Sequence, residues 1–422
     1  MTARPPLVTP RPRAAIFISY RQSDGSPAAA RLAWALRATG LPVWHDQTDL
    51  PPGDTVRVIS QALASGLSGA VLVVTDDIVK SPVVKNIEWP RIRQLSNDGN
   101  FTLGVLNAIR HAKGSVYAEP DRLLRRLSDR ILRRFRHHLS GLKQYRSSSK
   151  GDQTDQLAAD MLRQRLHHLA PSIRTRGHIE VSLTTRAEPT AEYAEAADLT
   201  FCWDRAEARE VSATAQQIFQ RTFHVAAGAL RQHTAGTIRF RGQAHLSFGL
   251  AIGASLALGP AIEFANDDGL WSVSRHRMSM QPTLVEVSSS ARASTGPVLV
   301  YVDLLKPASR GAYDALARSG GWSERVHVER HDRESHIPSS QGDQLAHEIA
   351  AEVRSASARN RNAQVHLLLY APLPIAVLVG TLLNTLDVVV YEWDRGGDGV
   401  PASYAPKFRL RPGELNPITL PD

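Results

Sequence analysis

The stretch AAIFISYRQSD at residues 14–24 decides the fold of the first part of the chain. Its apolar run, residues 14–20, is typical of a strand buried on both faces, because parallel strands covered by helices lose the polar alternation of half-exposed ones. Helical and apolar segments alternate after it, so we expect a parallel α/β domain over residues 1–142. The further strands are expected at 41–44, 70–75 and 101–106, and the helices at 27–39, 56–64 and 87–95.

The composition is that of a globular protein with more than one domain. The chain has 422 residues, of which 42% are hydrophobic and 22% charged, and this length exceeds one ordinary core. The N-terminus lacks the apolar segment of a signal peptide. The most apolar stretches, 246–258 and 373–386, are shorter than the about 20 residues that span a bilayer. We therefore expect a soluble, cytoplasmic protein without a membrane partner.

The charge balance favours a small polyanion over a nucleic-acid duplex as the ligand. The formal net charge is +9, from 50 Lys and Arg against 41 Asp and Glu. Because no helix carries a dense basic stripe with a DNA-reading motif, duplex DNA is not an expected partner. Cys202 is the single cysteine and no CxxC or CxxH spacing occurs, so we expect no disulfide and no metal.

A polar segment separates the first domain from the rest of the chain. KQYRSSSKGDQTDQ at residues 143–156 has the composition of a linker. We expect the linker to cover residues 143–164 and a second domain to cover residues 165–422.

The second domain shows an internal duplication. A single offset of 127 residues aligns Gly253 with Gly380 and the strand at 238–242 with the strand at 365–369. Each half reads strand–helix–strand–helix–strand, which is a doubly wound α/β pattern. The alternative is that two similar stretches share element lengths by chance.

Three motifs occur in order in the first domain: FISYRQSD at 17–24, VWHDQTDLPPGD at 43–54 and VVTDDIVKSPVVKNIEWPRI at 73–92. Their order and spacing resemble TIR domains over residues 13–140. The resemblance implies a flavodoxin-like sheet of five parallel strands, with a ligand site at the carboxyl ends of the strands. It also implies NAD⁺ as the substrate, with no cofactor. Val83 and Val84 depart from the family, which often has Trp-Cys there.

Cleavage of NAD⁺ breaks an N-glycosidic bond whose leaving group is already cationic. What the reaction needs is a carboxylate beside the oxocarbenium-like ribose. The resemblance implies that Glu88 is this catalytic residue. The expected substrate-binding residues are Ile18, Ser19, Tyr20, Trp44, Asp46 and Ser81. A purely structural role for Trp44, as a core aromatic, and for Asp46, as a loop cap, is the alternative.

The same resemblance implies that a BB loop covers the site and takes part in contact between two TIR domains. Its residues here are Asp49, Pro51, Pro52 and Gly53.

Two stretches of the second domain, RFRGQAHLSFGLAIGASLALGPAIEF at 239–264 and HLLLYAPLPIAVLVGTLLNTLDVVVYEWD at 366–394, resemble SAVED domains. The resemblance implies two fused Rossmann-like, CARF-like units that bind a cyclic oligonucleotide made by a CD-NTase. Such a pocket needs backbone donors at helix starts, positive charge and aromatic faces. The candidate contacts are Trp203, Arg205, Arg241, Gln243, His245, Tyr370, Pro372 and Trp393. For each of them a structural role is the alternative.

Together the two resemblances imply an anti-phage effector of the CBASS type. A cyclic oligonucleotide, by family analogy cyclic tri-adenylate, would drive self-association through both domains and activate hydrolysis of NAD⁺ to nicotinamide and ADP-ribose or cyclic ADP-ribose. The first alternative is a TIR module that only oligomerises and recruits a partner. A second alternative is a C-terminal domain that binds linear RNA or a mononucleotide.

Overall fold

The computed structural model forms two compact units. The first comprises Met1–Arg176, Glu188–Glu210 and Arg221–Ala229, and the second Gly177–Ala187, Val211–Gln220 and Leu230–Asp422. The structure describes residues 9–45, 55–109, 139–147, 151–185, 197–202, 213–233, 236–274, 282–291, 295–305, 310–332, 336–396 and 401–421. None of the helices in these ranges has the length and apolarity needed to cross a membrane.

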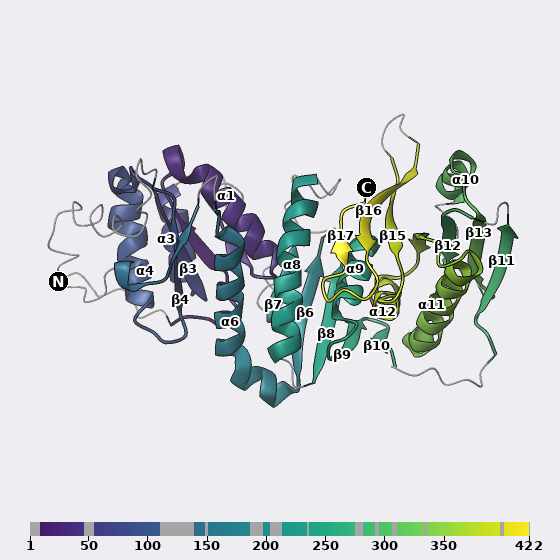
Figure 1. Cartoon of the computed structure of the whole chain (residues 1–422). Helices are drawn as coiled ribbons and strands as arrows, with labels where there is room; N and C mark the ends of the chain where they lie inside the picture. The colour runs from purple at the N-terminus through teal and green to yellow at the C-terminus, as the bar shows by residue number, and fades with distance from the viewer. Residues whose placement is uncertain are drawn as a thin grey trace. The chain divides into compact units, whose positions relative to one another are not determined.

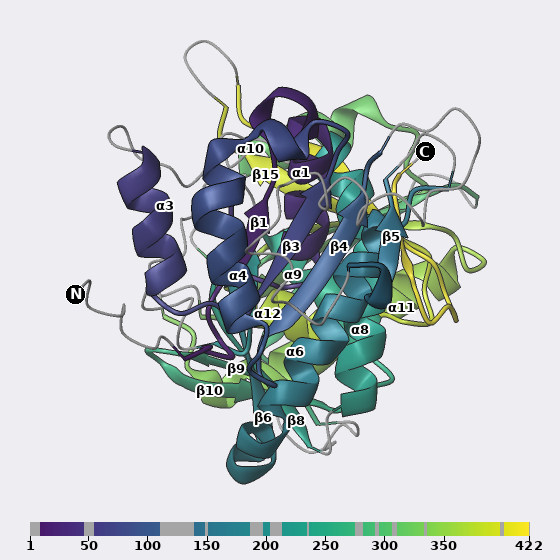
Figure 2. The same ribbon diagram turned by 90° about the vertical axis from the view of Figure 1, so that its left-hand side faces the viewer.

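The first unit is built on a five-stranded sheet with the order β2-β1-β3-β4-β5. All neighbouring strands are parallel, and Figure 2 shows β1, β3, β4 and β5 side by side. This is the flavodoxin-like order that the sequence predicts. The strands are β1 (Ile16–Ser19), β2 (Val43–Trp44), β3 (Gly69–Val74), β4 (Thr102–Asn107) and β5 (Gln144–Arg146).

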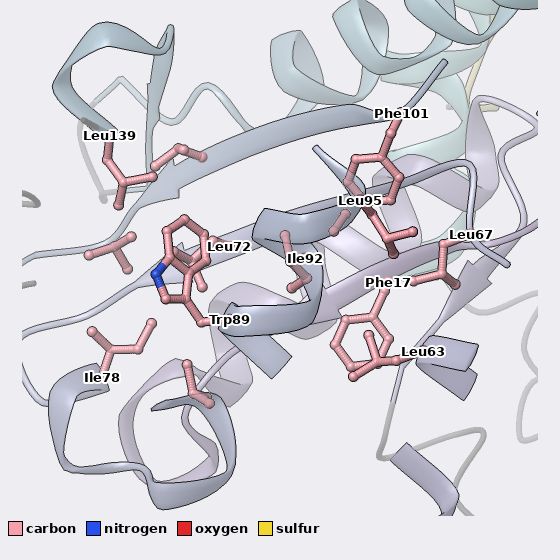
Figure 3. Close-up of a cluster of buried hydrophobic side chains, with 14 of the residues drawn as sticks. Phe17, Leu63, Leu67, Leu72, Ile78, Trp89, Ile92, Leu95, Phe101 and Leu139 are labelled. Carbon is pink, nitrogen blue, oxygen red and sulfur yellow. The ribbon is translucent and has the colours of Figure 1, made fainter. Parts of the chain in front are cut away.

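Helices cover both faces of this sheet, and Figure 1 shows α4 on one side of β3 and β4 and α6 on the other. Because side chains alternate along a strand, each strand contributes side chains to a hydrophobic core on either face of the sheet. Figure 3 shows one of them, in which Phe17 and Leu72 of the sheet meet Leu63 of α3 and Trp89 of α4. The helices are α1 (Gln22–Ala38), α3 (Thr55–Ala64), α4 (Trp89–Leu95) and α6 (Thr154–Arg176), with short helical turns η1 (Ile78–Lys80), η2 (Val84–Glu88) and η4 (Leu139–Gly141).

Helix α6 packs on the opposite face, close to the strands. A Cβ atom at Gly104 would lie 3.0 Å from Leu157 Cδ1, so the glycine permits this approach. Arg165 of α6 is fully buried and donates hydrogen bonds to the carbonyl oxygens of Arg13 (2.6 Å) and Ala14 (2.8 Å), just before β1. Burial lowers the pKa of Arg165 to about 10.

The segment expected to be a linker, residues 143–164, contains regular structure. Strand β5 continues the first sheet, and α6 begins at Thr154 and runs to Arg176. A three-residue edge strand leaves no apolar pattern in the sequence, which explains why composition alone indicated a loop. The domain limits themselves remain a prediction.

The second unit contains the two halves that the duplication predicts. In the first half, β6, β8 and β9 are parallel neighbours and β10 runs antiparallel to β9. In the second half, β12, β14 and β15 are parallel neighbours and β16 runs antiparallel to β15. The same order and directions therefore recur, which confirms the repeated doubly wound pattern. The strands of the first half are β6 (His178–Thr184), β8 (Thr237–Gln243), β9 (Ala261–Asn266) and β10 (Gly269–Ser272).

The second half has a seven-stranded sheet with the order β11-β13-β12-β14-β15-β16-β17. Its strands are β11 (Val285–Ala291), β12 (Val298–Asp303), β13 (Glu324–Arg330), β14 (Val365–Tyr370), β15 (Val388–Asp394), β16 (Ser403–Leu410) and β17 (Ile418–Thr419). The remaining elements of the chain are β7 (Leu199–Cys202), α8 (Ala213–His233), α9 (Leu246–Leu256), α10 (Arg310–Ser319), η6 (Ser339–Gln341), α11 (Gly342–Arg359) and α12 (Leu373–Leu382).

The two halves meet through α9 and α12, which pack against each other. A Cβ atom at Gly253 would lie 2.0 Å from Val377 O, and one at Gly380 would lie 2.2 Å from Leu250 O. The two glycines that the sequence offset aligns thus lie at the helix crossing, where any side chain would collide with backbone.

Candidate functional site

Strand β1 and turn η2 bring Ser19 and Glu88 together in the first unit. Ser19 ends β1 and lies on the same side of the strand as Phe17, facing α3 and α4. Its Oγ donates a hydrogen bond of 2.5 Å to Glu88 Oε2. Both side chains are buried, at 0% and 6% exposure. A hydrogen bond to a carboxylate is strong, so Ser19 holds Glu88 in one orientation.

Glu88 is the last residue of a π-helical turn that runs directly into α4. A π-turn is rare and often marks a functional position, because it redirects the side chains that follow it. Ser81, expected to bind substrate, accepts a hydrogen bond of 3.3 Å from Val84 N. Ser81 therefore fixes the start of the turn that carries Glu88.

The other expected substrate residues lie in different environments. Trp44 stacks on Phe17, with ring centroids 4.9 Å apart, and packs against the core cluster to which Phe17 belongs. Its described contacts are those of a core aromatic. Tyr20 stacks on His45 at 5.4 Å. Ile18 alternates to the other side of β1 from Ser19, so its side chain points away from the Ser19–Glu88 pair. Its part in substrate binding stays a prediction.

An ion-pair network that the sequence analysis did not single out joins the loops after β1 and β3. Arg21 Nη1 lies 2.9 Å from Asp77 Oδ2, and Lys80 Nζ lies 2.8 Å from Asp77 Oδ1. Asp77 N donates a hydrogen bond of 3.2 Å to Asp24 Oδ2. The hydrogen bond from Lys80 is the main cause that holds the pKa of Asp77 below its usual value. The network orders two loops at the sheet edge where flavodoxin-like folds bind ligands.

A pocket of about 380 Å³ opens in the second unit at the carboxyl ends of β8, β14 and β15. Three of the predicted contact residues, Gln243, Tyr370 and Trp393, line it. Tyr370 and Trp393 meet edge to face at 5.8 Å. The other lining residues are Gly242, Ala244, Leu246, Leu305, Leu369, Ala371, Leu373 and Glu392.

The starts of α9 and α12 lie at this pocket, since their first residues, Leu246 and Leu373, line it. The preceding residues, His245 and Pro372, are extended, and within the described chain neither side chain caps its helix. Backbone N–H groups at helix starts bind anions. Glu392 Oε2 accepts a hydrogen bond of 2.9 Å from Ser247 N, which shows that the start of α9 binds an anionic oxygen.

His245 and Arg241, predicted as contacts, are not among the lining residues. His245 Nδ1 lies 2.9 Å from Thr185 Oγ1, and Thr185 Oγ1 also accepts a hydrogen bond from His245 N, so His245 fixes the loop before α9. Arg241 lies on β8 two residues before Gln243 and is half-buried. Pro372 lies between the lining residues Ala371 and Leu373.

Two lining residues that the sequence analysis missed have structural signals. Gly242 has a φ of +108°, and a Cβ atom there would lie 2.2 Å from Leu183 O, so no larger residue fits. Glu392 directly precedes Trp393, so it lies within the stretch 366–394 that resembles SAVED domains. The predicted residues Asp46, Asp49, Pro51, Pro52, Gly53, Trp203 and Arg205 lie outside the described residues.

Two family models match the chain. The model described as "TIR domain" matches residues 16–135. The model of the SAVED domain, described as "SMODS-associated and fused to various effectors sensor domain", matches residues 212–410.

Among curated proteins, "NAD(+) hydrolase PdTIR" from Paracoccus denitrificans (strain Pd 1222) is 37% identical over 97 residues, which are 23% of this chain and 29% of that protein. The chain therefore spans less than a third of that relative.

Among solved structures, the Cap4 SAVED/CARF-domain containing receptor of Acinetobacter baumannii with the cyclic trinucleotide 2′3′3′-cAAA has a TM-score of 0.45 at 10% identity, covering 93% of this chain and 99% of that chain. The corresponding receptor of Moraxella osloensis has a TM-score of 0.37 at 11% identity, covering 91% and 98%.

Proposed function

Because the chain joins a TIR domain to a SAVED domain, we propose that it cleaves NAD⁺ and that a cyclic oligonucleotide switches this activity on. The observation that carries the chemical half is the buried Ser19–Glu88 pair at the end of β1. The 37% identity of the matched segment to a protein named as an NAD⁺ hydrolase supports the same reaction.

In the proposed reaction, the bond between C1′ of the ribose and the nicotinamide nitrogen breaks. Nicotinamide leaves as a neutral molecule and takes the bonding electron pair. The Glu88 carboxylate stabilises the positive charge that develops on the ribose, and Ser19 keeps that carboxylate in place. Water then bonds to C1′ and loses a proton, which gives ADP-ribose; attack by the substrate's own adenine gives cyclic ADP-ribose.

The pocket of the second unit is the proposed sensor site. Ser247 N is bonded to Glu392, so the backbone donors proposed for phosphate groups are Leu246 N at the start of α9 and Leu373 N at the start of α12. The rings of Tyr370 and Trp393 offer faces to bases. Cyclic tri-adenylate is the first ligand to test. The ligand would be the product of a CD-NTase, and loss of NAD⁺ from an infected cell would be the anti-phage output.

We further propose that the ligand acts by driving assembly. In this scheme the BB loop of one TIR domain contacts the Glu88 face of the next and completes its site. The isolated chain is then almost inactive, and activity rises with both ligand and protein concentration.

The test is NAD⁺ consumption by the full chain, with and without a panel of cyclic di- and trinucleotides. The expected result is cleavage only with one class of ligand, lost in Glu88→Gln and retained in Glu286→Gln, a control on the exposed face of β11. Equal cleavage without any ligand would contradict the switch, and full activity of Glu88→Gln would contradict the catalytic assignment. Ligand-dependent oligomers that leave NAD⁺ intact would support the recruiting module instead.

A further inference from the structure

A group of ionisable side chains on β12 and β13 belongs to neither site. The register of these parallel strands pairs Asp303 with Glu329 and Tyr301 with His327. Asp303 and Glu329 are therefore two carboxylates on neighbouring strands, and like charges placed opposite each other are unfavourable. Such a pair needs a cation.

Asp303 is a buried carboxylate without a hydrogen-bond partner among the described residues. Its side chain is 0% exposed, and neither carboxylate oxygen has a hydrogen-bond partner among the described residues. A buried carboxylate without donors or a cation is strongly destabilising, because it has lost its hydration and gained nothing in return. The closest basic group that the structure gives it is His327, whose Nε2 lies 3.9 Å from Asp303 Oδ2.

The geometry of His327 suits a metal ligand. Its Nδ1 lies 2.8 Å from Glu329 Oε1, so in the tautomer whose Nδ1–H donates to this carboxylate the lone pair is on Nε2. Arg310 Nη1 lies 3.3 Å from this Nε2 and Asp303 Oδ2 lies 3.9 Å from it. A distance of 3.9 Å is too long for a hydrogen bond, but it suits two ligands of one cation, which each bind at about 2.0–2.2 Å. Stacking on Tyr301, with centroids 5.0 Å apart, holds the ring in place.

We propose that Asp303 and His327 bind a divalent cation of the zinc or manganese class, and that Glu329 orients His327 through Nδ1. One ligand atom each of Asp303, His327 and Glu329 lies within 4.8 Å of the others. One imidazole with carboxylates suits these ions better than magnesium, which prefers oxygen ligands alone. The inference is independent of the proposed enzymatic function.

Arg310 is the competing cation. Its Nη1 lies 3.1 Å from His327 Nδ1, 3.3 Å from His327 Nε2 and 3.3 Å from Glu329 Oε1. Its Nε lies 3.6 Å from Asp314 on the same helix. The side chain is 46% exposed, so it can move toward Asp314 when a metal binds. Arg310 neutralises Glu329, but no contact joins it to Asp303 among the described residues.

The experiment uses the full chain without a polyhistidine tag, stripped with a chelator and titrated with ZnCl₂ or MnCl₂ by calorimetry. After dialysis, mass spectrometry measures the metal content. We expect one equivalent bound by the wild type, and affinity at least about 10-fold lower in Asp303→Asn and in His327→Gln. The control His336→Gln removes an exposed histidine and should bind like the wild type.

The Arg310→Gln variant distinguishes a metal site from a general loss of folding. Because this substitution removes the competing cation, the variant should bind the metal more tightly than the wild type, which an unfolded protein would not do. Circular dichroism reports whether each variant is folded. Absence of stoichiometric zinc or manganese binding by the wild type would overturn the proposal. So would wild-type affinity in folded Asp303→Asn and His327→Gln.

Discussion

Ser19 helps to hold Glu88 in position. Its hydroxyl donates a hydrogen bond of 2.5 Å to that carboxylate. We predict that Ser19→Ala lowers kcat for NAD⁺ by about 10- to 100-fold, because a hydrogen bond to a charged group contributes about 1.5–3 kcal/mol. KM should change little, since the reacting ribose is affected more than the rest of the substrate.

Ligand-activated steady-state kinetics measure both constants. The matched control is Ser60→Ala, which removes an exposed hydroxyl on α3. This hydroxyl donates a hydrogen bond to Val56 O, one turn earlier in the same helix. Unchanged kcat in Ser19→Ala would show that Glu88 does not need this support.

His366 makes the stability of the second unit depend on pH. Burial lowers the pKa of its imidazole to about 4, and its Nδ1 lies 2.9 Å from the Tyr391 hydroxyl. The unfolded chain, with a histidine pKa near 6.5, takes up the proton first. The stabilisation is therefore complete above about pH 6.5 and is lost as the pH falls toward 4.

Melting temperatures at pH 7.5 and pH 5.0 test this sign. The wild type should lose more stability on acidification than His366→Asn, in which the titrating group is gone. His336→Asn, at an exposed position, should keep the pH dependence of the wild type. An identical acid loss in all three proteins would contradict the assignment.

At the scale of elements, α9 and α12 cross with their backbones close together at two glycines. We predict that Gly253→Ala and Gly380→Ala each destabilise this unit by about 1–3 kcal/mol or more, because the added methyl group would lie 2.0–2.2 Å from carbonyl oxygens. Urea denaturation followed by circular dichroism measures the change.

Gly311→Ala in α10 is the control, because no atom lies within 4 Å of the Cβ it would add. It should leave stability unchanged or raise it, since alanine favours a helix over glycine. Gly253→Ala with the stability of the wild type would show that the helices separate easily and that the crossing is not fixed by these glycines.

The elements also show what the sequence can predict. Continuous apolar runs gave strands at 70–75 and 101–106, and β3 and β4 span Gly69–Val74 and Thr102–Asn107. Strand β5 was missed because Gln144–Arg146 is short, polar and at a sheet edge.

The sequence predicts those residues of the two candidate sites that lie in local motifs or directly after strands. Glu88 and the pocket residues Gln243, Tyr370 and Trp393 follow strands or belong to recognisable motifs. Because every residue of β1 is buried, the apolar run does not show which of its side chains lie on the Glu88 side of the sheet. The meeting of Asp303 with Glu329 depends on strand register, which no local pattern in the sequence encodes.

At the scale of the whole molecule, we propose two different roles for two sites in one chain. Glu88 would determine how fast NAD⁺ is cleaved, and the pocket with Tyr370 and Trp393 would determine how much ligand is needed. A variant in the first unit should change the maximal rate and leave binding intact. A variant in the pocket should change the ligand requirement and leave the maximal rate intact.

The most direct measurement is the rate of NAD⁺ cleavage as a function of cyclic oligonucleotide concentration, in the wild type, Glu88→Gln and Trp393→Ala. Loss of one stacking partner weakens binding by about 1–3 kcal/mol, so Trp393→Ala should need about 10- to 100-fold more ligand and reach the same maximal rate. Glu88→Gln should bind the ligand normally and show no cleavage at saturation. Cleavage by the wild type that does not depend on ligand, or a Trp393→Ala curve that superimposes on that of the wild type, would contradict the account.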